Sequence, residues 1–125
     1  MIVGSGIDVV ETGRVERELA RIPWQTTHGI FTTDEIHCFN SSKTPTLLFA
    51  GCFAAKEATL KALGIAVTNL ANFSDIEVLP DPRGNWSLSL HGHSLSISQK
   101  LGVQRVSVAV TTSKKLSGAM VVLEA

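Results

Sequence analysis

The sequence predicts a single α+β domain over residues 1–125, in which an antiparallel sheet packs on one long central helix. Three observations support this class. The chain has 125 residues, enough for one hydrophobic core but too few for two comfortable domains. A long apolar stretch between Pro45 and Gly64 has the length and the end signals of a helix. Hairpin-forming segments are segregated from helical ones, which favours α+β over a regularly alternating α/β order.

The first part of the chain is expected to form a strand and two helices. Residues 2–10 are β-branched with interspersed glycines, and they predict a strand. Thr12 is suited to cap a helix that runs to about Ile22. A short helix follows to about Phe39, with Thr32 or Thr33 as its N-cap.

The long helix is expected to begin at Pro45 and to end at Leu63, with Gly64 as its C-cap. A hairpin, a short helix and two closing strands should follow. Their expected ranges are strand 73–80, turn 81–85, strand 86–90, helix 91–102, and strands 106–112 and 117–124. No repeat or domain linker interrupts this order.

Composition and charge exclude several classes of protein. Eleven basic and eleven acidic residues give a formal net charge of zero, so no overall field attracts nucleic acid or a membrane surface. The start MIVGSGID lacks the features of a signal peptide, and no run approaches the roughly 18 apolar residues of a membrane helix. Cys38 and Cys52 do not form a disulfide pattern, which favours free thiols and a cytoplasmic location.

A thinly charged surface favours an oligomer. Charged residues make up 18% of the chain, and the average for soluble domains is about 25%. The two closing strands are apolar on both alternating faces, as expected for strands that are covered on both sides. One face can pack on the long helix, and the other is expected to meet a second subunit.

Charges on the long helix are the first candidate functional residues. Glu57 and Lys61 lie four positions apart on one face, beside small side chains, on a helix that is otherwise largely apolar. A buried charge is costly unless it is paired or binds an ion. Asp8 lies on the first strand, where two glycines share its face. Two carboxylates and a lysine suit Mg²⁺ and a phosphate, although the spacing alone favours an ordinary Glu–Lys pair, because such pairs are common.

Two motifs lie far apart in the chain: GSGIDVVETGRV at residues 4–15 and FAAKEATLKALG at residues 53–64. Together they resemble the holo-acyl-carrier-protein synthase type of 4′-phosphopantetheinyl transferase. G-x-D alone is a weak signal, but joined to F-x-x-K-E-x-x-x-K at this separation it is specific. The resemblance covers nearly the whole chain, because further segments follow in family order: FTTDE (31–35), DIEV (75–78), GNWSLSLHG (84–92) and VVLE (121–124).

The resemblance implies transfer of the phosphopantetheine arm from coenzyme A to a serine of apo acyl carrier protein, in fatty acid biosynthesis. Carried to matching positions, it implies Asp8 and Glu57 as ligands of Mg²⁺ and Lys61 as the cation that neutralises the leaving phosphate. Positioning and electrostatics supply most of the acceleration in such a transfer. The base for the serine proton is open between Glu57 and a metal-bound water. The resemblance also implies a trimer with each coenzyme A site between neighbouring subunits.

The chain departs from the family pattern at two places. Many members have arginine where Cys52 stands, and a Ser-His pair where Thr111 and Thr112 stand. These two threonines are the expected coenzyme contacts, with a lower affinity for phosphate because threonine donates only a neutral hydrogen bond. Arg83, in the hairpin turn, is a further candidate contact. Cys52 is expected to be a buried apolar residue and not a nucleophile.

Arginines on the first helix are the candidate contact for an acidic carrier protein. Arg14, Arg17 and Arg21 lie on one flank at spacings of three and four. A solvated helix face is the simpler alternative, because Glu16 and Glu18 are interspersed. Two other functions stay open beside the transferase: a carrier-protein-binding module without catalysis, and a small Mg²⁺-dependent phosphohydrolase.

Overall fold

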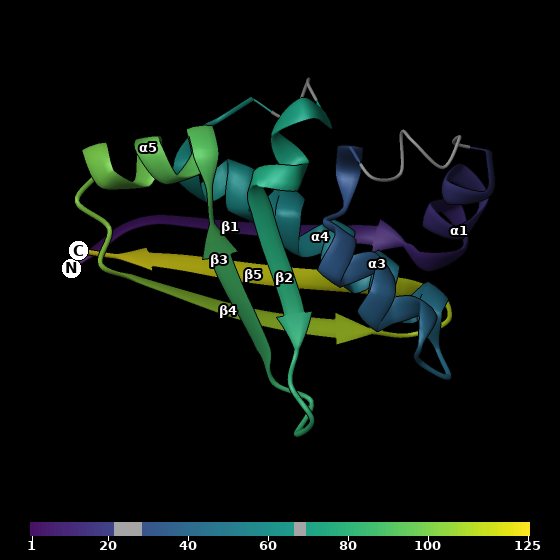
Figure 1. Cartoon of the computed structure of the whole chain (residues 1–125). Coiled ribbons are helices and arrows are strands. Elements are labelled where there is room, and N and C mark those ends of the chain that lie inside the picture. The colour runs from purple at the N-terminus through teal and green to yellow at the C-terminus, as the bar shows by residue number, and fades with distance from the viewer. Residues whose placement is uncertain (22–28, 67–69) are drawn as a thin grey trace.

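The structure of the chain is a computed structural model, which describes residues 1–21, 29–66 and 70–125 (Figure 1). The described elements are β1 (Ile2–Glu11), α1 (Thr12–Arg21), α3 (Thr33–Asn40), α4 (Pro45–Leu63), the 3-10 helix η1 (Leu70–Asp75), β2 (Ile76–Pro80), β3 (Trp86–Leu90), α5 (Gly92–Lys100), β4 (Arg105–Thr112) and β5 (Leu116–Glu124). They follow the predicted order, and the fold is α+β. The predicted helix end at Ile22 lies outside the described residues. Within the described part of the chain, no helix is both long and apolar enough to cross a membrane.

The strands form two antiparallel sheets. Three strands pair in the order β1-β5-β4, and the predicted hairpin forms a separate sheet of β2 and β3. In Figure 1 the hairpin runs steeply across the long strands of the other sheet. The predicted strand 73–80 begins only at Ile76, because the residues before it complete η1.

Helix α4 packs along the inner face of the three-stranded sheet, and the β2–β3 hairpin contacts it as well (Figure 1). Glycines make the contact with β1 possible. A Cβ added at Gly4 or Gly6 would overlap with the carbonyl oxygens of Ala62 and Ala58, respectively. The backbone of α4 therefore approaches the glycine face of β1 closely, which places this helix directly beside Asp8.

The predicted signals are confirmed at the start of α3 and the end of α4, whereas Thr12 is the first residue of α1 and its hydroxyl donates to the carbonyl oxygen of Ser113 instead of capping the helix. Thr32 is the N-cap of α3, and it forms a capping box in which its hydroxyl accepts from the N–H of Glu35 while the Glu35 carboxylate accepts from the N–H of Thr32. Gly64 closes α4 in the left-handed region, with φ of 75°. With Pro45 in its first turn, Gly64 determines the extent of α4 and hence which of its residues reach the sheet.

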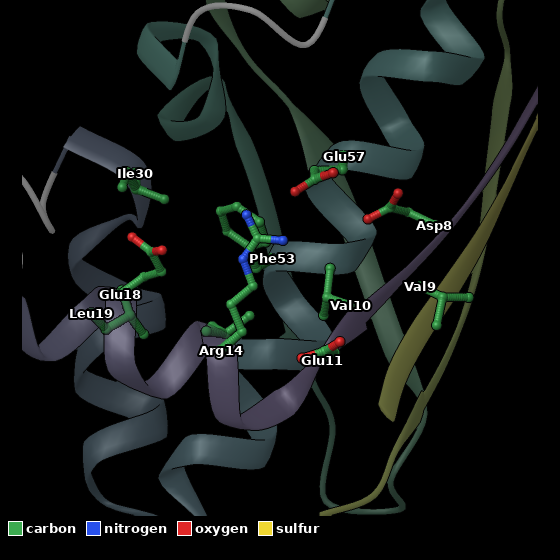
Figure 2. A pocket seen from close by; sticks show the side chains of 11 residues that line it. Asp8, Val9, Val10, Glu11, Arg14, Glu18, Leu19, Ile30, Phe53 and Glu57 are labelled. Carbon is green, nitrogen blue, oxygen red and sulfur yellow. The ribbon is translucent and has the colours of Figure 1, made fainter. Parts of the chain in front are cut away.

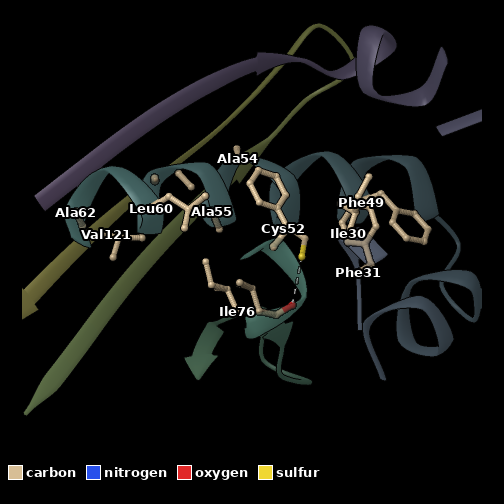
Figure 3. Close-up of a cluster of buried hydrophobic side chains, with 14 of the residues drawn as sticks. Ile30, Phe31, Phe49, Cys52, Ala54, Ala55, Leu60, Ala62, Ile76 and Val121 are labelled. Carbon is tan, nitrogen blue, oxygen red and sulfur yellow. Dashed lines mark hydrogen bonds between the residues drawn. The ribbon is translucent and has the colours of Figure 1, made fainter. Parts of the chain in front are cut away.

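The core lies around α4, whose buried residues pack against the aromatic side chains of α3 and η1 and against β5 (Figure 3). The other face of the three-stranded sheet is uncovered in the single chain. Ile7 and Val9 on β1 are 64% and 60% exposed, and Leu116 and Met120 on β5 are exposed as well. An apolar sheet face of this kind is unusual for a lone subunit.

Candidate functional site

A pocket of about 540 Å³ opens between β1, α1 and α4 (Figure 2). One end is polar and contains Asp8 and Glu57, and the other is largely apolar. The lining residues are Asp8, Val9, Val10, Glu11, Arg14, Val15, Glu18, Leu19, Ile30, Phe53 and Glu57. The pocket thus joins the two sequence motifs, which lie about 50 positions apart in the chain and meet because α4 packs on β1.

Asp8 presents one bonded and one unbonded oxygen at this end. Its side chain is only 11% exposed, and Oδ1 lies 2.7 Å from the ammonium of Lys61. The same ammonium donates to the carbonyl oxygen of Ile7 at 3.2 Å. Oδ2 is buried and has no hydrogen-bond partner among the described residues. A buried carboxylate oxygen without a donor is expensive unless a cation or a proton approaches it.

Glu57 lies beside Asp8 at this end of the pocket. Burial, and then the neighbouring Asp8 carboxylate, raise the pKa of Glu57 from 4.5 to about 7, against the opposing effect of Lys61 and Arg14. A proton on Glu57 is favoured because two adjacent carboxylates repel each other when both are charged. Figure 2 shows both carboxyl groups at the same end of the pocket.

Lys61 therefore does not act as the ordinary partner of Glu57 on one helix. It forms its ion pair with Asp8, across the contact between α4 and β1. That hydrogen bond raises the pKa of Lys61 above its ordinary value, so the side chain remains a cation. Its side chain is 47% exposed and accessible to a ligand.

The three arginines of α1 differ in position. Arg14 lines the pocket, and Figure 2 shows its side chain extending from α1 toward Phe53 on α4. Arg17 and Arg21 are exposed and lie outside the pocket lining. The structure thus separates Arg14, which the sequence grouped with a docking stripe, from the other two.

The predicted coenzyme contacts lie elsewhere in the single chain. Arg83 is in the tip of the hairpin, where its N–H donates to Asp81 Oδ1 at 2.8 Å. Thr111 and Thr112 end β4 and are two strands away from Val9 and Val10. Thr112 faces α4 near Gly51, whereas Thr111 is exposed. Their contact with a coenzyme stays a prediction.

Cys52 lies in the interior of the fold, as predicted. It is fully buried, and its thiol points away from solvent into the core (Figure 3). Burial and the negative charge of Glu35 raise the pKa of Cys52 well above its ordinary value. A protonated, inaccessible thiol is not a nucleophile.

The sequence analysis did not identify the buried ion pair that Lys56, a further charged residue of α4, forms. Lys56 is completely buried and pairs with Glu35, which is equally buried, at 2.7 Å. The signal was present in the helical pattern, because Lys56 shares the face of Cys52 and Thr59, at spacings of four and three. A lysine on an otherwise uncharged, buried face requires an acidic partner.

The polar end of the pocket fits a divalent cation. Asp8 and Glu57 supply hard oxygen ligands, and the unpartnered Oδ2 provides a free coordination position. In the described residues, no three or more acidic, histidine or cysteine side chains are placed to hold one metal ion. Two protein ligands suit an ion that completes its shell with water and phosphate oxygens, as Mg²⁺ does. Fold and pocket together define the class, a small α+β protein with two carboxylates, suited to a divalent cation, at one end of its pocket.

Comparisons with known proteins agree with this class. Residues 4–114 match the family model "4'-phosphopantetheinyl transferase superfamily". The chain is 36% identical over 124 residues to the holo-[acyl-carrier-protein] synthase of Syntrophus aciditrophicus, covering 99% of this chain and 97% of that protein. The chain belongs to the 4′-phosphopantetheinyl transferase superfamily, as an enzyme of the holo-[acyl-carrier-protein] synthase type.

Solved structures of such enzymes have the same fold. The synthase from Neisseria meningitidis superimposes with a TM-score of 0.85 at 30% identity, over all of both chains. A Bacillus anthracis synthase, solved in complex with CoA (3',5'-ADP), gives a TM-score of 0.79 at 35% identity, covering 100% of this chain and 98% of that one. The predicted family is therefore confirmed.

Proposed function

We propose that this enzyme transfers the 4′-phosphopantetheine arm of coenzyme A to a serine of apo acyl carrier protein, in a reaction that depends on Mg²⁺. The products are the holo carrier protein and adenosine 3′,5′-bisphosphate. The observation that carries the proposal is the arrangement of Asp8 and Glu57 at one end of the pocket, with Lys61 paired to Asp8. Solved synthases with bound coenzyme A, from Bacillus anthracis and Helicobacter pylori, support the choice of co-substrate.

Asp8 and Glu57 are the residues that would hold Mg²⁺, whose charge would draw the pyrophosphate oxygens to this end of the pocket. Lys61 stays protonated beside Asp8 and offers a second cation to the phosphate. As the bond between phosphorus and the bridging oxygen breaks, negative charge grows on the leaving phosphate. Lys61 stabilises that charge without moving, because Asp8 already holds it in place.

Arg14 has a different role from its two neighbours in this proposal. It lines the pocket close enough to lower the pKa of Glu57, so it adds positive charge near the reacting groups. Arg17 and Arg21 are exposed and free to contact an acidic helix of the carrier protein. Electrostatic attraction of this kind raises the association rate and orients the partner.

The functional form in this proposal is a homotrimer. The uncovered sheet face, with Ile7, Val9 and Met120 exposed, supplies the apolar surface for contact between subunits. Arg83 and Thr111 lie away from the pocket of their own chain. In the trimer they would contribute to coenzyme sites at the borders between subunits. The whole chain acts as one transferase domain, in fatty acid biosynthesis in the cytoplasm.

One assay tests the function. Purified protein is incubated with coenzyme A, Mg²⁺ and an apo acyl carrier protein, and the mass of the carrier is measured. A gain of one phosphopantetheine arm, lost when a chelator is added, supports the proposal. Binding of the carrier without a mass change would indicate a binding module instead. Cleavage of coenzyme A without a carrier would indicate a phosphohydrolase.

A further inference from the structure

Helix α4 carries a charged side chain that the proposed chemistry does not use. Lys56 is adjacent to Glu57 in sequence, but it points away from the pocket and is completely buried. Its ammonium lies 2.7 Å from Glu35 Oε1. It also donates to the backbone carbonyl oxygens of Ile30 and Phe73, each at 2.9 Å. All three ammonium protons therefore have an acceptor.

Both carboxylate oxygens of Glu35 likewise accept hydrogen bonds. Its Oε1 accepts from Lys56 and from the N–H of Thr32 at 2.8 Å. Its Oε2 accepts from the N–H of Val78 at 2.7 Å and from the thiol of Cys52 at 3.3 Å. The pair thus joins α4 to the start of α3 and to β2. Buried ion pairs are often no more stabilising than apolar side chains of the same volume, so stability alone does not explain this one.

The two carbonyl groups that Lys56 holds belong to segments that build the pocket wall. Ile30 lines the pocket itself. The ring of Phe73 packs edge-on against that of Phe53, with centroids 5.3 Å apart, and Phe53 also lines the pocket. Figure 2 shows Ile30 on the opposite side of the pocket from Asp8. One ammonium group thus ties this wall to the helix that presents the catalytic carboxylate.

We propose that Lys56 is a positioning residue, which sets the distance between the Asp8–Glu57 carboxylates and the apolar wall at Ile30. The inference rests on the proposed function, because that distance matters only if a substrate lies between the two. A methionine at this position could fill the volume of the lysine, but it could not hold the two carbonyl oxygens. A misplacement of about 1 Å can reduce a rate by on the order of 100-fold.

Variants of the Lys56–Glu35 ion pair separate an effect on the position of the pocket wall from an effect on the stability of the fold. Glu35→Gln removes the pairing charge but keeps Lys56, which even as a neutral amine has two N–H groups for the two carbonyl oxygens. We expect a lower unfolding temperature, with kcat/KM within about threefold of the unmutated enzyme. Lys56→Met combined with Glu35→Gln removes both buried charges, so its unfolding temperature should equal or exceed that of Glu35→Gln. Its kcat/KM should nevertheless fall at least about tenfold.

If Lys56 only stabilised the fold, kcat/KM of the variants would rise and fall with their unfolding temperatures. Kinetics are measured at a temperature where every variant is folded, with Thr59→Val as the control. Thr59 is a buried polar residue on the same helix, and among the described residues its hydroxyl bonds to the carbonyl of Ala55, within α4. Unchanged kcat and KM in the double variant would overturn the proposal.

Hydrogen exchange provides a readout that does not need activity. If Lys56 holds the wall, amide exchange in residues 29–32 and 73–75 should accelerate in the double variant and stay unchanged in Thr59→Val. Equal exchange in the double variant and the unmutated protein would show that the wall does not depend on Lys56. If the unmutated protein transferred nothing to a carrier protein, the proposed function would fail, while the exchange result would still decide what Lys56 holds.

Discussion

Lys61 donates to Asp8 Oδ1 over 2.7 Å, and this bond joins the last turn of α4 to the middle of β1. Asp8 Oδ2 has no hydrogen-bond partner among residues 1–21, 29–66 and 70–125, and Glu57 is close enough to Asp8 for its pKa to be raised. Helix α4 therefore contributes both Lys61, a cation that orients Asp8, and Glu57, a carboxylate that competes with Asp8 for a proton. The two carboxylates are placed to bind a metal ion, and Lys61 is placed to bind an anion beside it.

Replacing Lys61 should affect catalysis more than folding. Its side chain is half exposed, so its ion pair with Asp8 contributes little to stability. We expect Lys61→Met to lower kcat by about 100-fold, because a preorganised charge at the leaving group is lost, and to leave the thermal unfolding midpoint nearly unchanged. Lys100→Met, at the exposed end of α5, is the control and should alter neither quantity. Normal turnover of Lys61→Met would remove this residue from the mechanism.

Glu57→Gln keeps the size of the side chain but removes its charge. We expect transfer at ordinary Mg²⁺ concentrations to be lost, because one of two carboxylate ligands is gone. The fold should persist, since a neutral group beside Asp8 removes a repulsion. Transfer is measured by carrier mass over a range of Mg²⁺ concentrations, and Glu16→Gln on α1 is the control. Near-normal turnover of Glu57→Gln at limiting Mg²⁺ would show that Glu57 is not a ligand.

Stability without metal should depend on pH through Glu57. Its pKa in the folded protein is about 7, above the ordinary value of 4.5. The folded state therefore holds this proton to higher pH than the unfolded chain does. The resulting stabilisation is fully present below pH 4.5 and is lost as the pH rises through about 7.

Urea unfolding in a chelator, from pH 4 to 8, measures this dependence. The free energy of unfolding of the unmutated protein should fall relative to that of Glu57→Gln across the window between the two pKa values. The comparison with the variant removes the contribution of the four histidines, which both proteins share. Parallel pH profiles would contradict the raised pKa.

Charge reversal on α1 should weaken the carrier protein's attraction. Because Arg14 lines the pocket, the docking test uses Arg17→Glu with Arg21→Glu, which lie outside it. We expect the KM for the carrier protein to rise and its salt dependence to flatten, with the KM for coenzyme A unchanged. Lys43→Glu with Lys100→Glu changes the net charge equally at exposed positions elsewhere. If both double variants behaved alike, net charge and not local docking would be responsible.

We expect the exposed face of the three-stranded sheet to be buried between the subunits of a trimer. Light scattering should give about three times the chain mass of 13.4 kDa. Met120→Glu places a charge in the centre of that face and should yield monomers, whereas Ser107→Glu, on the same face of β4, should have a smaller effect. A fully active monomer at assay concentration would contradict a site shared between subunits.

Mixed trimers test that sharing directly. A chain with Asp8→Ala lacks the metal end of the pocket, and a chain with Arg83→Glu lacks the predicted contact at the rim of its neighbour. If each site takes Asp8 from one subunit and Arg83 from the next, some sites in a mixed trimer are intact. Co-refolding the two inactive chains should restore part of the activity. If no activity were restored, Asp8 and Arg83 of one chain would serve the same site.

Local signals made most of the fold predictable. Pro45 and Gly64 define α4, Thr32 caps α3, and the turn after Pro80 closes the hairpin, because each acts through its own backbone and that of its neighbours. The chemistry of Asp8 and Glu57 was also predictable, since two charged positions stand out on an apolar strand and helix. The boundary before Ile76 was missed, because the predicted strand includes the aromatic Phe73 as its first residue, whereas Phe73 belongs to η1.

The sequence by itself determined the elements, the charged groups on them and the family. Only the tertiary structure decided which charges meet: Lys61 pairs with Asp8 and not with Glu57, Lys56 pairs with Glu35, and Arg14 turns into the pocket. The reason is geometric. Periodicity identifies the residues that share a face of α4, but the rotation of that helix over the glycines of β1 determines which face each partner meets, and that rotation depends on packing between segments far apart in the chain.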